Sequence, residues 1–157
     1  MALEFSPETL AKFEQIVARY PKKEAAMLPV LNLAQREFGY LGDEAVAYVA
    51  RLMDQSPARV LGVVSFYTML NRHPVGRHHI QVCRTLPCAL GGAEKITSYI
   101  KSKLGIEVGQ TTADGRFTLA EVECLASCGT APMMQINDAY YENLTEARVT
   151  EILDSLR

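Results

Sequence analysis

The spacing of apolar residues follows two different patterns along the chain. Up to residue 72, apolar positions recur every three or four residues, as on one face of an amphipathic helix. The predicted helices start at Ser6-Pro7, Lys22-Lys23, Asp43 and Ser56-Pro57. Pro29 leaves the start of the second helix open, because proline is tolerated only in a first turn. This pattern predicts a small helical bundle.

After residue 77 the pattern changes to strands mixed with helices. Alternating and β-branched residues predict a strand that ends at Cys83. The other predicted elements are strands ending at 124 and covering 132–136, the latter resumed at 140–141 after a turn, and helices over 91–105 and from 145 onward. In this β-α-β-β-α order, Cys88 lies in a loop just ahead of a helix N-terminus, where backbone N–H groups favour an anion.

The two patterns meet in a stretch that is typical of a linker. Residues 71–77 contain His73-Pro74-Val75-Gly76, a turn signal. We therefore predict two domains, a helical bundle over residues 1–72 and an α/β domain over residues 73–157. The expected fold class is α/β in the second domain and α+β for the whole chain.

Composition and charge exclude several classes of function. The chain has 157 residues, of which 48% are hydrophobic and 22% charged, as in ordinary globular proteins. A formal net charge of −2 with mixed signs offers no basic stripe, so we expect no nucleic-acid binding. The first residues lack the regions of a secretory signal, and the apolar run 60–70 is too short to span a bilayer. We expect a soluble, cytoplasmic chain without direct membrane insertion.

The four cysteines carry the candidate chemistry, and they form two close pairs, Cys83-x4-Cys88 and Cys124-x3-Cys128. In a reducing cytoplasm, ligands or reactive thiols are more plausible than disulfides. Two short loops that each supply two thiolates are typical of a metal or iron–sulfur site. Neither pair has the Cys-x-x-Cys spacing of thiol exchangers, and no histidine lies inside either cysteine loop, as a Rieske centre requires. A four-cysteine zinc site stays open on spacing alone.

Two features favour iron and sulfide over zinc. The second half has enough large apolar residues to fold without metal, whereas four-cysteine zinc sites often hold very small folds together. The chain also shows no general base, phosphate loop or nucleophile set, which suits an electron carrier better than an enzyme acting alone. Split pairs match two irons with two cysteines each. Arg84 could either donate to such a centre or be a solvated loop residue.

The residues around the cysteines resemble those of the thioredoxin-like [2Fe–2S] ferredoxins, over 83–88 with Gly91 and over 122–129 with Ala131-Pro132. More closely, the chain is similar to the E-type family, the small peripheral [2Fe–2S] subunits of bacterial respiratory complex I (NADH:quinone oxidoreductase). This resemblance covers almost the whole chain, including 28–31, 38–41, 65–68, 135–138 and 141–145. It identifies the cluster ligands as Cys83, Cys88, Cys124 and Cys128. Ala126 stands where many relatives have glycine, which we expect to alter only loop detail, because alanine fits any conformation with a negative φ.

The resemblance implies a thioredoxin-like fold for the second domain, one [2Fe–2S] cluster, and a docking role for the helical bundle. It implies a partner flavoprotein of the F type, which holds FMN and NADH, and other subunits of the peripheral arm. The chain would be a non-catalytic electron-transfer subunit, peripheral to the inner membrane, and it shows no nucleotide-binding fingerprint of its own. The equivalent subunit of an NAD-dependent hydrogenase or formate dehydrogenase, a free-standing ferredoxin and a zinc-stabilised docking module stay open.

Overall fold

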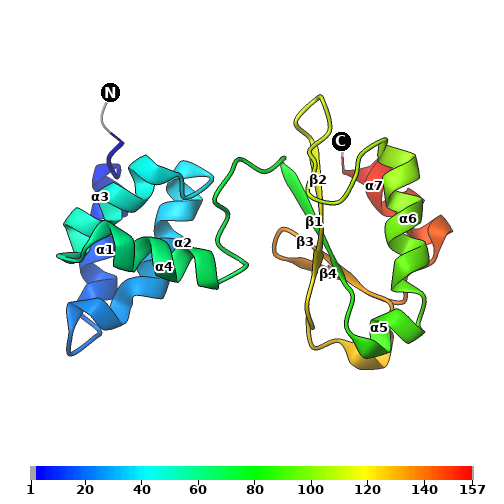
Figure 1. Ribbon diagram of the computed structural model, residues 1–157, viewed down its shortest axis with the longest axis horizontal. Coiled ribbons are helices and arrows are strands. Elements are labelled where there is room, and N and C mark those ends of the chain that lie inside the picture. The colour runs from blue at the N-terminus through cyan, green and yellow to red at the C-terminus, as the bar shows by residue number, and fades with distance from the viewer. Residues whose placement is uncertain (1–2, 157) are drawn as a thin grey trace. The chain divides into compact units, whose positions relative to one another are not determined.

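The computed structural model describes residues 3–156, which divide into two compact units with the boundary between Pro74 and Val75 (Figure 1). Each unit has its own cluster of buried apolar side chains. Burial of such side chains is the main source of folding free energy, about 1.5–3 kcal/mol for each large one. Within residues 3–156, no helix combines the length and apolar character needed to cross a bilayer.

The first unit is a bundle of helices, as the apolar spacing predicts. Its helices are α1 (Pro7–Val17), α2 (Met27–Phe38), α3 (Asp43–Met53) and α4 (Pro57–Phe66), with a 3₁₀ turn, η1, at Lys23–Ala26. Ser6 and Ser56 cap α1 and α4 by accepting backbone N–H groups, which confirms both Ser-Pro starts. The start predicted at Lys22-Lys23 is wrong for the α-helix. Because α2 begins at Met27, Pro29 falls in its first turn, where no intrahelical N–H is required.

The second unit contains a four-stranded sheet in the order β2-β1-β3-β4. Its strands are β1 (His78–Cys83), β2 (Phe117–Val122), β3 (Met134–Ile136) and β4 (Ala139–Tyr141). β1 runs parallel to β2 and antiparallel to β3, and β3 pairs antiparallel with β4. The helices α6 (Ala93–Leu104) and α7 (Glu146–Ser155) pack on the same side of the sheet (Figure 1). This arrangement confirms the mixed α/β class.

Two local predictions for this unit are wrong. Tyr140 and Tyr141 do not resume the preceding strand but belong to β4, which turns back beside β3. Asn137 makes this reversal possible, because its φ of 52° lies in the left-handed region that tight hairpin turns use. Cys88 does not lie in an open loop but inside a short helix, α5 (Leu86–Leu90). Five residues are too few for an apolar period to be visible in the sequence.

The core of the second unit extends to the cysteine end of the sheet. Its fully buried large side chains include Ile80, Ile100, Leu119, Met133 and Met134. Cys83 and Cys88 belong to the same buried cluster. The first cysteine pair is therefore part of the packed interior. The same core joins the sheet that carries Cys83 to α6 and α7.

Candidate iron–sulfur centre

The first cysteine pair is held by regular structure. Cys83 is the last residue of β1, and its N–H donates to the carbonyl oxygen of Met133 at 3.2 Å. Cys88 lies in α5, which begins after an extended Thr85 and has Pro87 in its first turn. The side chains of Cys83 and Cys88 are 3% and 2% exposed. Strand, helix and core packing thus fix both thiols before any metal binds.

The second cysteine pair lies in irregular chain after β2, and both members are exposed. Cys128 opens a single 3₁₀ turn, η2 (Cys128–Thr130). Between the two cysteines, Ala126 has a φ of 61°, so the expectation of a negative φ there is wrong. The left-handed conformation turns the chain back, and the Ala126 N–H donates to Cys124 Sγ at 3.3 Å. Glycine adopts this conformation without strain, which explains why it suits this position.

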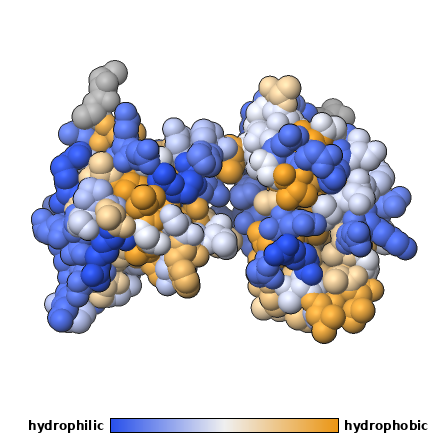
Figure 2. Space-filling view, in the orientation of Figure 1, coloured by the Kyte–Doolittle hydropathy of each residue, from blue (hydrophilic) through white to orange (hydrophobic). Residues whose placement is uncertain are grey.

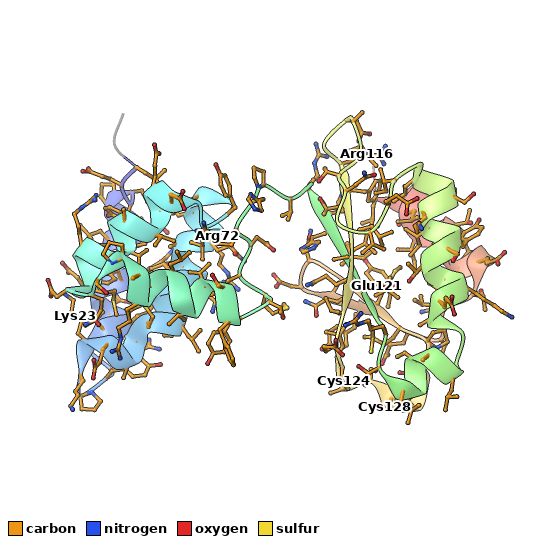
Figure 3. All side chains as sticks on the ribbon, viewed as in Figure 1. Lys23, Arg72, Arg116, Glu121, Cys124 and Cys128 are labelled. Carbon is orange, nitrogen blue, oxygen red and sulfur yellow. The ribbon has the colours of Figure 1, made fainter. Side chains whose placement is uncertain are left out.

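The two cysteine loops meet at the same end of the sheet. Burial opposes ionisation of the Cys83 thiol, but N–H donors from Leu125 and Thr85 outweigh it and lower the pKa of Cys83. Leu125 belongs to the second loop, so an amide of that loop points at a thiol of the first. Figure 3 places Cys124 and Cys128 together at this end of the unit, opposite Arg116.

Within each pair, the neighbouring cysteine contributes to the pKa of the other thiol. Burial, with a hydrogen bond to Cys83, raises the pKa of Cys88 to about 11. A hydrogen bond to Cys124 and its charge raise the pKa of Cys128. Cys83 also affects Cys128 through its charge, which means that the pairs lie within electrostatic reach of one another. The helix that carries Cys88, α5, contacts the turn η2 that begins at Cys128, so the two cysteine pairs lie at the same end of the sheet.

This donor set fits a two-iron cluster. All four cysteines are free thiols, and a [2Fe–2S] core takes two thiolates on each iron. Backbone N–H groups aimed at Cys83 and Cys124 stabilise negative charge on sulfur. Within residues 3–156, no three or more His, Cys, Asp or Glu side chains are grouped around a single ion position.

An exposed ion pair connects the two loops outside the thiols. Arg84, next to Cys83, donates to Glu123, next to Cys124, at 2.7 and 3.1 Å. The side chains are 60% and 73% exposed. Arg84 therefore pairs with a carboxylate rather than with a thiol.

Sequence reasoning missed a hydrogen-bonded group beside Cys128. The Glu142 carboxylate, which follows β4, accepts from the hydroxyls of Ser127 and Thr130, the latter at 2.6 Å. These hydrogen bonds, first Ser127 and then Thr130, lower the pKa of Glu142, with a smaller contribution from the charge of Arg148. The only sequence signal for this group was the position of Glu142 in the stretch 141–145 that resembles the E-type family.

Comparisons with known proteins show which family the chain belongs to. The family model for the thioredoxin-like [2Fe–2S] ferredoxin matches residues 13–157. The E subunit of NADH-quinone oxidoreductase from Rickettsia bellii is 46% identical over 156 residues, covering 98% of this chain and 93% of the relative. The mitochondrial NADH dehydrogenase [ubiquinone] flavoprotein 2 of Dictyostelium discoideum is 46% identical over 157 residues, or 98% of this chain. This chain spans only 64% of that longer relative.

A solved structure shows the same fold at lower identity. The crystal structure of an NAD+-reducing [NiFe]-hydrogenase in the air-oxidized state matches with a TM-score of 0.73 at 22% identity. The match covers 83% of this chain but 22% of the hydrogenase chain, so it supports the fold alone. The family model and the relative from Rickettsia bellii, which match nearly the whole chain, also establish the family. The chain belongs to the thioredoxin-like [2Fe–2S] ferredoxin family.

Proposed function

We propose that this chain is the electron-transfer subunit of an NADH:quinone oxidoreductase and binds one [2Fe–2S] cluster through Cys83, Cys88, Cys124 and Cys128. The observation that carries the proposal is the convergence of two thiol pairs at one end of the sheet, in a chain 46% identical to an E-type relative over nearly its full length. When bound, such a cluster accepts and releases single electrons. No residue of this chain is assigned a catalytic role.

The two cysteine loops differ in their exposure to solvent. Cys83 and Cys88 are buried, so their side of the site is shielded from water. Cys124 and Cys128 are exposed and leave the other side open to a partner. The amide donors of Ala126 and Leu125 stabilise thiolate charge at the site. One dry side and one open side suit a centre that exchanges electrons with another protein.

Exposed apolar side chains lie on the short helix that carries Cys88. Leu86 and Leu90 flank Cys88 on α5 and are 67% and 81% exposed. Figure 2 shows hydrophobic surface at the end of the unit where α5 lies. Exposed apolar patches of this kind mark protein interaction sites, because their burial against a partner is favourable. The cysteine end is therefore the face we assign to docking.

The partner we assign is a flavoprotein of the F type that holds FMN and NADH, together with other subunits of a peripheral arm. In this proposal, residues 1–72 act as a helical docking domain and residues 73–157 as the cluster domain. The assembly would lie on the cytoplasmic side of the inner membrane, and this chain would be peripheral to that membrane.

The proposal is tested by mixing the cluster-bound chain with the flavoprotein of the same assembly and adding NADH without oxygen. We expect an EPR signal of the reduced cluster with NADH only when the flavoprotein is present, because this chain has no nucleotide-binding fingerprint. Dithionite without flavoprotein serves as the positive control. A cluster that dithionite reduces but NADH and flavoprotein do not would contradict the proposed role. Co-purified proteins would distinguish a quinone oxidoreductase from an NAD-dependent hydrogenase or formate dehydrogenase.

A further inference from the structure

The loop that carries Cys128 is held down by side chains rather than by regular structure. Ser127, Thr130 and Glu142 form a three-residue group, which we call the Glu142 clamp. One carboxylate oxygen of Glu142 accepts both hydroxyls, and the two hydroxyl oxygens lie 2.8 Å apart. An ionised carboxylate only accepts hydrogen bonds, so both hydroxyls can donate to it at once. All three side chains are partly buried, which strengthens these charge-assisted bonds.

Backbone hydrogen bonds extend the clamp along the same segment. Asn143 N–H donates to the carbonyl oxygen of Thr130 at 2.8 Å, and Leu144 N–H donates to that of Pro132 at 3.0 Å. The chain after β4 therefore lies along the chain that follows Cys128. Ser127 immediately precedes Cys128 in the chain. A hydrogen bond that fixes Ser127 therefore also restricts the backbone of Cys128.

We propose that Glu142 is a positioning residue: through Ser127 and Thr130 it fixes the loop that presents Cys128, and it places a negative charge beside the iron–sulfur site. This inference rests on the proposed function, because it takes Cys128 as a cluster ligand. Hydrogen-bonded partners of ligands orient them and tune the centre they hold. A fixed negative charge disfavours the arrival of a further electron, so Glu142 lowers the reduction potential of the site.

Two substitutions separate position from charge. Glu142→Gln keeps an oxygen that accepts both hydroxyls but removes the charge. Glu142→Ala removes the acceptor and the charge together. Glu151→Gln, at an exposed position on α7, is the matched control, since it changes the net charge of the chain equally.

The experiment measures iron release to a chelator and the midpoint potential by EPR-monitored titration, on the full chain with its cluster. We expect Glu142→Ala to release iron roughly tenfold faster than wild type, as lost partners of ligands typically cause. Glu142→Gln should release iron at nearly the wild-type rate but titrate at a higher potential. Glu151→Gln should change neither quantity. Wild-type iron release in Glu142→Ala would overturn the proposal, and so would a Glu142→Gln potential shifted no more than that of Glu151→Gln.

A third readout separates this inference from the proposed function. In the cluster-free chain, hydrogen exchange of amides 124–130 should be faster in Glu142→Ala than in wild type. The hydrogen bonds of the Glu142 clamp do not require the cluster, so their loss should already be visible without it. If wild type held zinc, the proposed function would fail while this exchange difference would remain. Equal exchange in the two cluster-free proteins would overturn the clamp even if wild type bound a [2Fe–2S] cluster.

Discussion

The two cysteine pairs provide the same kind of ligand but are held by different means. Cys83 and Cys88 lie in a strand and a helix and are almost completely buried. Cys124 and Cys128 lie in exposed, irregular chain that local hydrogen bonds shape. Regular structure and core packing place the first pair, whereas the second depends on a few polar contacts. The site therefore combines a rigid half with a half whose geometry single side chains can alter.

The largest expected effect is loss of the cluster, and it should be equal for the two pairs. Either Cys88→Ala or Cys128→Ala should abolish the visible absorption of the anaerobically purified chain, because three thiolates cannot complete two irons. Retention of the wild-type spectrum in either variant would remove that residue from the ligand set.

The same two substitutions should differ once the cluster is absent. Cys88→Ala empties a packed position and should lower the free energy of unfolding of the cluster-free chain by about 1 kcal/mol. Cys128→Ala should leave it unchanged, because the side chain is exposed. Urea denaturation followed by circular dichroism measures both. Equal losses would contradict the distinction between a buried and an exposed pair.

The next effect concerns the contact between the end of α5, which follows Cys88, and the segment that follows Cys128. A Cβ at Gly91, just after α5, would lie 3.1 Å from Pro132 N and 3.3 Å from Ala131 C. Backbone atoms cannot move aside cheaply, so Gly91→Ala should destabilise the chain by roughly 1–3 kcal/mol. Gly129→Ala is the control, since a Cβ there meets nothing within 4 Å. A Gly91→Ala protein as stable as Gly129→Ala would show that this close approach is unimportant.

A smaller effect, of opposite sign, is expected inside the exposed loop. Ala126 holds a φ of 61°, which costs an L-residue about 1–2 kcal/mol. Ala126→Gly removes this strain but adds freedom to the unfolded chain, at a cost of roughly 0.5–1 kcal/mol. The free energy of unfolding should rise by about 0–1.5 kcal/mol in chemical denaturation. A decrease would mean that the left-handed conformation is not strained here.

The smallest effect is expected from the ion pair between the loops. Arg84 and Glu123 are mostly exposed, and exposed pairs contribute little. A double-mutant cycle with Arg84→Ala and Glu123→Ala should give a weak coupling at low salt that disappears at high salt. A coupling that persisted at high salt would show that the pair, rather than the Glu142 clamp, joins the exposed loop to the rest of the unit.

The contrast between the pairs also explains what the sequence could predict. β1 and the helices of the first unit follow from apolar periodicity, which local sequence encodes directly. The four cysteines follow from their spacing. The φ of Ala126 and the contact between Glu142 and Ser127 do not, because both depend on how distant segments pack. Asn137 likewise carried a turn signal whose effect, a new antiparallel strand, depends on β3 as a partner.

The central claim is that the four thiols hold one [2Fe–2S] cluster, and metal and sulfide analysis of the anaerobically purified chain tests it most directly. We expect a red-brown protein with about two irons and about two acid-labile sulfides per chain. Reduction should then produce an EPR signal that Cys124→Ala lacks. A colourless protein that contains zinc and no sulfide would contradict the account.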